Sequence, residues 1–137
     1  MTDFNALIID EFRRNGGHVE TEGFGDRLIL LHTTGARTGA ARVNPLMGIP
    51  TDDGWLVAAS KGGAPEEPAW AHNLRAHPAI QVETGTGTVP TTAVELRGAE
   101  RDAAWQRFTA ASSGFASYEK RTKRTIAVFH LVRDTTA

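Results

Sequence analysis

The pattern of apolar and polar positions along the chain predicts short strands separated by a few helices. Near the N-terminus, Phe4, Ile8 and Phe12 recur at helical spacing, with Leu7 beside them, and predict an amphipathic helix over residues 3–15. A Gly-Gly pair follows and supplies a C-terminal stop. We expect this helix to cover one face or end of a sheet rather than to bind a membrane.

Six further segments have the pattern of strands, at residues 27–34, 42–50, 55–60, 79–84, 89–97 and 126–132. The first is almost continuously apolar, which predicts burial on both of its faces. The second alternates, so that Arg42 and Asn44 share one face. Its prolines cannot donate to a ladder, which predicts an edge or a bulge. Asp-Gly and Gly-Thr-Gly sequences predict two of the turns as hairpins.

Helices are also predicted at residues 68–77 and 99–111, with one or two further helical turns at 115–122. Hairpin-connected strands with short helices favour a mainly β fold of the α+β class, a small antiparallel barrel with helices packed on its outside. The length of 137 residues fits one domain, 1–137, with the first helix within 1–17 and the barrel within 27–133. The interior of so small a barrel is filled by side chains, so a large ligand would lie in an external groove.

Composition excludes several classes of function. The chain has no cysteine, which removes disulfides, thiolate metal sites and cysteine nucleophiles. The histidines show no ligand spacing, so no metal site is expected. A formal net charge of -1 argues against nucleic-acid binding. The apolar runs are too short to span a bilayer, and the N-terminus lacks the pattern of a secretory signal. We expect a cytoplasmic protein, with peripheral contact at the inner membrane face left open.

The first candidate site is the turn GARTG between the first two strands. From Arg27 to Thr51 the chain has no Asp or Glu, whereas it carries Arg37 and Arg42. Glycine-rich backbone and guanidinium groups together are typical of a site for an anion. The turn matches neither the P-loop nor the dinucleotide-binding fingerprint. The alternative is a polar hairpin with solvated arginines.

The second candidate is the stretch SKGGAPEEPAWAHN, which follows the third strand. Lys61 adds a cation, and the glycines after it allow the backbone to approach a ligand closely. The next helix would present free N–H groups at its N-terminus, although Glu66 and Glu67 could be the partners of that dipole instead. In the alternative interpretation, Trp70 belongs to the core and Asn73 to a cap or hydrogen-bond network.

The third candidate is the pair Phe115 and Tyr118 on the last short helix. Such a pair more often serves packing, but a tyrosine hydroxyl near a bound ring could donate a proton or orient a substrate. The sequence has no evident nucleophile–base pair. An anion site without a nucleophile indicates a bound cofactor that supplies the chemistry.

Three blocks of the sequence resemble the deazaflavin-dependent nitroreductases and F420H2-dependent quinone reductases: TTGARTGAARVNPLM, ASKGGAPEEPAWAHNLRAHP and FASYEKRTKRTIAVFHL. They cover the chain from about Leu28 to Val132. The resemblance implies a six-stranded antiparallel split β-barrel related to FMN-binding ones. It also implies an oxidoreductase that transfers hydride from reduced coenzyme F420 to quinone or nitro-aromatic acceptors.

The resemblance also implies residue roles. The cofactor phosphate would be held by Arg37, Thr38 and Arg42, with Lys61 and the backbone of Gly62 and Gly63 nearby. The lactyl and deazaflavin region would be lined by Asn44, Pro45 and Leu46, and the ring flanked or supported by Ala59, Ser60, Trp70 and Asn73. Phe115 and Tyr118 would face the acceptor. Ser60 and Tyr118 are the candidates for polarising the acceptor or donating a proton, with water as their rival.

The sequence departs from the family pattern on the acceptor side. Ser112-Ser113-Gly114 stands where a Tyr-Pro pair is common, Phe115 replaces a common tyrosine, and Ala36 replaces a frequent cation. We therefore expect cofactor binding to be shared with the family more closely than substrate preference. Two alternatives stay open: a split-barrel reductase that uses FMN, and a non-catalytic carrier of the deazaflavin. The sequence leaves the oligomeric state open as well.

Overall fold

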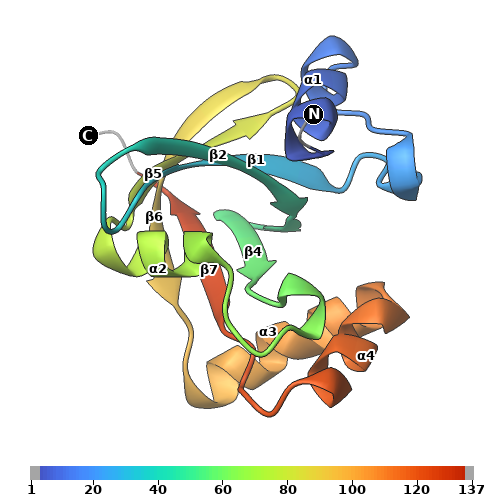
Figure 1. Cartoon of the computed structure of the whole chain (residues 1–137), viewed down its shortest axis with the longest axis vertical. Coiled ribbons are helices and arrows are strands. Elements are labelled where there is room, and N and C mark those ends of the chain that lie inside the picture. The colour runs from blue at the N-terminus through green and yellow to red at the C-terminus, as the bar shows by residue number, and fades with distance from the viewer. Residues whose placement is uncertain (1–3, 135–137) are drawn as a thin grey trace.

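The computed structural model describes residues 4–134, in which one curled antiparallel sheet is flanked by helices (Figure 1). The strands are β1 (Leu28–Thr34), β2 (Ala41–Met47), β3 (Ile49–Thr51), β4 (Gly54–Ala58), β5 (Ala79–Thr84), β6 (Gly87–Glu95) and β7 (Val128–Arg133). The helices are α1 (Phe4–Arg14), α2 (Ala69–Ala76), α3 (Gly98–Ala111) and α4 (Ser113–Arg121), with short 3-10 turns η1 (Thr21–Gly23) and η2 (Lys61–Gly63). A mainly β fold with short helices is thus confirmed.

The sheet order is β2-β1-β5-β6-β7-β4-β3, so its two edge strands follow each other in the chain. They are separated by Gly48 alone, whose N–H donates to the Arg27 carbonyl at 3.0 Å. A Cβ at Gly48 would lie 2.7 Å from Cδ1 of Ile29, so a larger residue here would force the Ile29 side chain to move. The chain therefore crosses here from one edge of the sheet to the other, and the sheet curls on itself.

The prediction of six strands is wrong by one, because residues 42–50 form two strands rather than one. The prolines did predict an edge, but the single residue at which the chain changes edges was not anticipated. The strand predicted at 79–84 has the bounds of β5, and the others shift by one to three residues. The helical turns predicted at 115–122 are confirmed, although α4 begins earlier, at Ser113.

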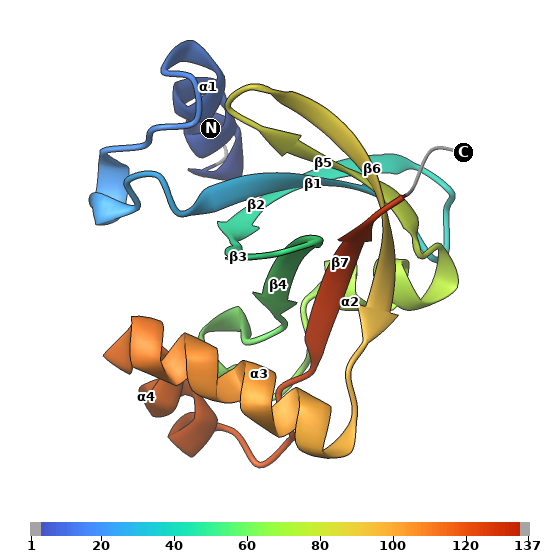
Figure 2. The ribbon, with the colours of Figure 1, turned by 180° about the vertical axis from the view of Figure 1, so that it is seen from behind.

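Three apolar clusters hold the elements together. The largest fills the inside of the curled sheet and includes Leu31, Val57 and Leu131. A second joins α3 and α4 to the outer face of β4 and β7, and a third joins α1 to β1. Figure 2 shows α1 and the α3–α4 pair at opposite ends of the sheet, which leaves the side between them open.

Helix α1 has the predicted amphipathic pattern only in part. Ile8 and Phe12 are buried, but Phe4 and Leu7 are 50% and 53% exposed. The first turn of the helix lies beside a small pocket of about 140 Å³ that Phe4, Phe24 and Leu46 help to line. The prediction that the apolar residues of this helix share a buried face is therefore wrong for the first turn, because that turn lies over a surface depression and not over the core. Within residues 4–134, no helix is both long enough and apolar enough to cross a membrane.

An ion pair fastens α1 to the sheet. Arg13 donates from Nε and Nη2 to the two carboxylate oxygens of Glu83 on β5, both at 2.9 Å. His32 on β1 lies with Nε2 at 2.8 Å from the same carboxylate. The bidentate hydrogen bonds from Arg13, with the contact from His32, lower the pKa of Glu83 from 4.5 to about 2.

This lowered pKa predicts acid sensitivity of the folded state. A carboxyl whose pKa falls on folding stabilises the protein above its unfolded pKa and loses that contribution as the pH drops through its folded pKa. We expect Glu83→Gln to lower the free energy of unfolding by about 1–2 kcal/mol at neutral pH. The difference from the parent should shrink as the pH falls from 4.5 to about 2. Chemical denaturation at several pH values measures this, with the exposed Glu119→Gln as control. A difference that stayed constant over this range would contradict the assignment.

Candidate functional site

The turn between β1 and β2 is held by its own backbone. The Gly39 N–H donates to the Gly35 carbonyl at 2.9 Å, and the Gly35 N–H donates to the Ala40 carbonyl at 2.8 Å. Thr38 accepts a hydrogen bond from the Ala40 N–H through Oγ1, and Gly39 has a φ of 72°, a conformation that favours glycine. The side chains at the tip therefore project from a fixed loop.

Arg37 and Arg42 are both exposed. Among the described residues, neither guanidinium has a hydrogen bond or an ion pair within the protein, whereas Arg13, Arg14 and Arg75 all pair with carboxylates. Two unpaired guanidinium groups on one ordered hairpin leave their charge available to an external anion.

Asn73 on α2 ties this turn to the rest of the site. Its Oδ1 accepts a hydrogen bond from the Ala36 N–H at 2.9 Å, and its Nδ2 donates to Thr33 Oγ1 at 3.3 Å. Asn73 is only 7% exposed. Asn73 therefore joins the turn and β1 to α2 through the hydrogen bonds of its buried side chain. This is the hydrogen-bond network that the sequence analysis gave as the alternative role of Asn73.

The loop after β4 forms the second part of the site. Ser60 is right-handed, with φ −77° and ψ −40°, and Lys61 is left-handed, with φ 46°. Lys61 Nζ lies 3.1 Å from Glu66 Oε1, and this pairing lowers the pKa of the Glu66 carboxyl. Glu67 is held by both terminal nitrogens of Arg75 at 2.8 Å. The two glutamates thus pair with side chains near the start of α2 and do not cap it.

Two of the residues that the sequence associates with the ring lie inside the core. Ala59 is fully buried, and Trp70 is 9% exposed and meets Phe129 edge to face at 6.0 Å between ring centroids. The backbone of Ala59 also has partners, because its N–H donates to the Ala127 carbonyl at 2.9 Å and its carbonyl accepts from Arg124 at 3.0 Å, so Ala59 presents no free atom to a ligand. Trp70 instead packs α2 against the core inside the sheet.

Helix α4 packs directly on the loop. A Cβ built on Gly63, whose φ is 82°, would lie 2.8 Å from the Tyr118 carbonyl oxygen and 3.0 Å from the Tyr118 Cα. Phe115 turns inward, at 5.1 Å from the Phe108 ring and 6.0 Å from the Trp105 ring. Tyr118 is partly exposed at the outer end of this aromatic cluster, 5.6 Å from Phe115.

On β2 the alternation of side chains is as predicted. Leu46 packs toward the cluster inside the sheet and Val43 toward α1, while Asn44 is partly exposed. Pro45 and Leu46 line the small pocket beside α1, and Arg42 lines an open groove of about 470 Å³ with Thr34.

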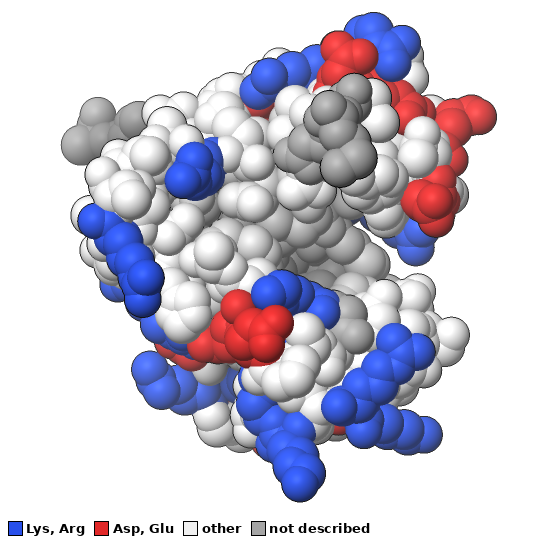
Figure 3. Space-filling model, viewed as in Figure 1, with Lys and Arg blue, Asp and Glu red and all other residues white. Residues whose placement is uncertain are grey.

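The three predicted motifs are therefore linked in space, from the turn through Asn73 and α2 to the loop, and from the loop to α4. They do not line one enclosed cavity. Figure 3 shows the front of the molecule hollowed between the part that carries α1 and the part that carries α3 and α4. A ligand that contacted all of them would be elongated and would lie in an open groove.

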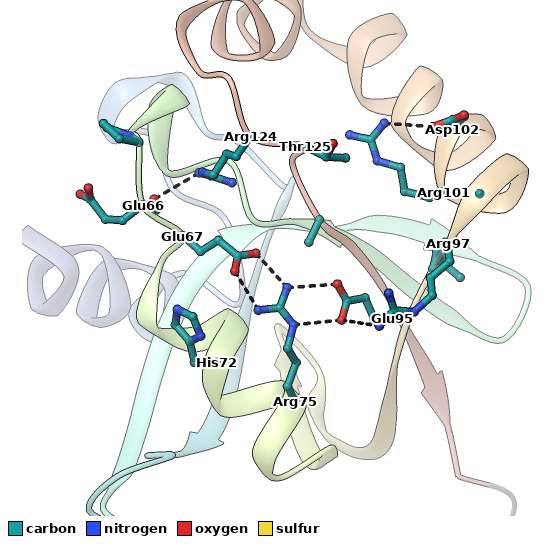
Figure 4. Close-up of a pocket in the computed structure, with 14 residues that line it drawn as sticks. Glu66, Glu67, His72, Arg75, Glu95, Arg97, Arg101, Asp102, Arg124 and Thr125 are labelled. Atoms are coloured by element: carbon teal, nitrogen blue, oxygen red, sulfur yellow. Dashed lines mark hydrogen bonds and ion pairs between the residues drawn. The ribbon is translucent and has the colours of Figure 1, made fainter.

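Another groove, of about 730 Å³, lies between α2, α3 and β6 and contains none of the predicted residues (Figure 4). Its cations already have partners. Arg75 bridges Glu67 and Glu95, and Arg101 donates to the Ile126 carbonyl at 3.1 and 2.7 Å. This groove has no unpaired cation like those of the turn, so its network fastens elements together rather than forming an anion site.

Sequence reasoning missed Arg124, which lies between α4 and β7. Its guanidinium donates to the backbone carbonyls of four residues of the second motif: Ala59, Ser60, Ala64 and Glu66. In the sequence it is one of several cations in the run EKRTKRT, with nothing to distinguish it from a solvated one.

The fold and the site together define a split-barrel protein with a cationic turn and a glycine loop beside it. Residues 7–133 match the family model of the F420H(2)-dependent quinone reductases. An F420H(2)-dependent quinone reductase of Mycobacterium tuberculosis is 37% identical over 108 residues, 77% of this chain and 72% of the relative. The chain belongs to this family and is an F420-dependent oxidoreductase.

Solved structures with related sequences have the same fold. The F420-H2 dependent reductase FDR-A has a TM-score of 0.70 and 38% identity, over 77% of this chain and 93% of that one. A chain described as a domain-swapped dimer has a TM-score of 0.71 and 32% identity, over 94% of this chain and 99% of that one. The split-barrel class inferred from the sequence is confirmed, with the strand count corrected as above.

The contact between Gly63 and α4 predicts a strong effect of a single methyl group. A Cβ at a positive φ costs about 1 kcal/mol, and the overlap with Tyr118 should add about 1–3 kcal/mol as α4 is displaced. Gly25→Ala is the matched control, since Gly25 has a φ of 62° but no atom within 4 Å of its added Cβ. Thermal unfolding should show a clearly larger loss for Gly63→Ala. Equal losses in the two variants would mean that α4 does not depend on this contact.

Proposed function

We propose that this protein transfers a hydride from reduced F420 to a quinone or nitro-aromatic acceptor in the groove between the turn, the loop and α4. The observation that carries the proposal is the pair of unpaired, exposed guanidinium groups at Arg37, on the glycine turn, and at Arg42, at the start of β2. The name of the relatives, quinone reductase, supports a quinone as the acceptor.

The residues of the turn fit a phosphate-bearing cofactor. Arg37 and Arg42 have donors free, and charge-assisted hydrogen bonds to a phosphate contribute about 1.5–3 kcal/mol each. Thr38 contributes a hydroxyl beside them, although it already accepts from the Ala40 N–H. Lys61 adds charge only after it leaves Glu66, so it is the weaker anchor.

The ring of the cofactor would lie along the groove from the phosphate end. We assign the β2 side of the ring to Asn44, Pro45 and Leu46, and the loop side to the backbone of Ser60, Gly62 and Gly63. Ala59 is fully buried and would support this loop from behind. Trp70 and Asn73 act from behind, because they are buried and hold α2 and the turn. When bound, the reduced deazaflavin supplies a hydride, that is, one proton together with two electrons.

The acceptor needs a hydride and a proton, since F420H2 and a quinone give F420 and a quinol. Tyr118 is the partly exposed hydroxyl on the acceptor side, and Ser60 is the hydroxyl on the loop. Either could polarise an acceptor carbonyl or deliver the proton, with water as the rival. Phe115 shapes the acceptor side by packing behind Tyr118. Bringing the acceptor against the ring is the main contribution of the protein.

Phe4 and Leu7 are exposed on α1, and the cations Lys120, Arg121 and Lys123 are exposed on α4 and just after it. Figure 3 has Lys and Arg side chains gathered over the lower right, where α4 lies. This arrangement supports a cytoplasmic protein that contacts the inner membrane face peripherally when its acceptor is a lipid-soluble quinone. The relative described as a domain-swapped dimer motivates a test for dimer formation in solution.

Removal of one anchoring guanidinium tests the phosphate assignment. We expect Arg42→Ala to raise the Kd for F420 about tenfold or more, the equivalent of about 1.4 kcal/mol, and to change turnover of the bound complex less. Fluorescence titration of F420 measures the affinity. The matched control is Arg14→Ala, at an exposed arginine whose partner is Asp10 on the same helix. Equal affinities for the Arg42 variant and the parent would rule out the assignment.

A reoxidation assay separates the enzyme from the two alternatives. Reduced F420 mixed with the protein and menadione should be reoxidised faster than in the absence of protein. Binding without acceleration would indicate a carrier of the deazaflavin, and selective binding of FMN would indicate a flavin enzyme. A nitro-aromatic acceptor in the same assay tests the second class of substrate.

A further inference from the structure

We propose that Arg124 is a positioning residue that shapes the Ser60–Lys61 backbone into an anion-binding concavity. This inference rests on the proposed function in one respect, that the loop after β4 faces the cofactor. The contacts of Arg124 themselves are independent of that assignment.

The Arg124 guanidinium donates four hydrogen bonds to one loop. Nε donates to the Ala64 carbonyl at 3.1 Å and Nη1 to the Ala59 carbonyl at 3.0 Å. Nη2 donates to the carbonyls of Ser60 at 3.0 Å and Glu66 at 3.3 Å. The Arg124 backbone N–H is itself fixed by Thr122 Oγ1 at 3.3 Å. Among the described residues Arg124 has no ion pair with a carboxylate, and its side-chain hydrogen bonds go to backbone carbonyls.

The direction of these carbonyls decides the direction of the neighbouring N–H groups. In a trans peptide the C=O and the N–H that follows point to opposite sides. Carbonyls of Ala59 and Ser60 that face Arg124 therefore turn the N–H groups of Ser60 and Lys61 away from it. Within the described part of the chain, neither N–H group has an acceptor. Two adjacent donors are thus left free on the side of the loop opposite Arg124.

The backbone angles fit the same interpretation. Ser60 is right-handed and Lys61 left-handed, with φ of −77° and 46°, and such a pair makes successive N–H groups converge into a concavity that binds anions. A left-handed conformation is unfavourable for lysine and needs support from its surroundings. The Ser60 carbonyl supplies part of that support, since it accepts from both Arg124 and the Gly63 N–H, the latter at 2.9 Å.

Arg124 also links the loop to the acceptor side. It lies shortly after α4, which ends at Arg121, and α4 contacts the loop through Gly63 and the Tyr118 backbone. Figure 4 shows Arg124 reaching from the strand side of the groove toward Glu66. The loop is therefore held between Arg124 on one side and α4 on the other, which fixes Ser60 relative to Tyr118.

The chain offers a matched control in Arg101. Its guanidinium is also partly buried and also donates twice to a backbone carbonyl, that of Ile126, but it does not touch the loop. Lysine at either position keeps the charge and loses the forked geometry. Arg124→Lys and Arg101→Lys should therefore cost comparable stability, and only the first should disturb the loop.

Two measurements test the proposal. In the apoprotein, we expect Arg124→Lys to shift the amide resonances of Ser60 and Lys61, and Arg101→Lys to leave them in place. In F420 titrations, Arg124→Lys should raise the Kd about tenfold, whereas Arg101→Lys should stay within about twofold of the parent. Unchanged amides, or the same loss of affinity in both variants, would overturn the positioning role.

A second variant covers the case in which Arg124→Lys does not fold. Glycine adopts the left-handed conformation freely, so Lys61→Gly should reduce the loss of thermal stability that Arg124→Lys causes. Stability losses that simply add in the double variant, or a double variant that is also unfolded, would overturn the coupling between Arg124 and the Lys61 backbone.

The outcomes also separate this proposal from the proposed function. If Arg42→Ala weakens F420 binding and Arg124→Lys does not, the cofactor site stands and the positioning role falls. If the parent does not bind F420, the proposed function falls, and the apoprotein amide shifts still decide the role of Arg124.

Discussion

The close approach of Gly48 to Ile29 is the constraint on which the arrangement of the site depends. The chain leaves one edge of the sheet and joins the other within a single residue, and a side chain at this position would collide with Ile29. Because the two edge strands meet there, the sheet curls on itself, although β2 and β4 lie near opposite ends of the strand order. In the proposed function, the turn before β2 and the loop after β4 border the ligand groove.

Around that groove, the protein divides its arginines into two sets. Arg75, Arg101 and Arg124 are used internally, on carboxylates or carbonyls that join α2, α3 and the loop to the sheet. Arg37 and Arg42 have no partner among the described residues; Arg37 is on the turn that Asn73 holds, and Arg42 is at the start of the strand that follows it. Arginines that are hydrogen-bonded within the protein stabilise the fold, whereas guanidinium groups without a partner are available to a ligand. Membership of the F420H(2)-dependent quinone reductases makes F420 the ligand that we propose for these two cations.

Local patterns predicted most of the elements but few of the contacts. The apolar run of β1, the alternation along β2 and the Gly-Thr-Gly hairpin between β5 and β6 are determined within a few residues, and the structure has them as expected. Side-chain pairing across the chain is different. Lys61 was expected near the cofactor phosphate and lies beside Glu66. For Trp70 the sequence left a place beside the ring and a place in the core open, and the structure has it in the core. The locations of those partners depend on the packing of the whole chain.

The sequence by itself determined the strands, the two glycine-rich motifs and, through their resemblance to a family, the cofactor. These depend on local backbone chemistry and on residues that are contiguous in the chain. Only the tertiary structure decided which cations are free, where the sheet changes edge, and that Arg124 reaches loop residues about sixty positions earlier. A guanidinium has the same intrinsic chemistry wherever it occurs, and its function is set by the acceptors that the fold brings within hydrogen-bonding distance.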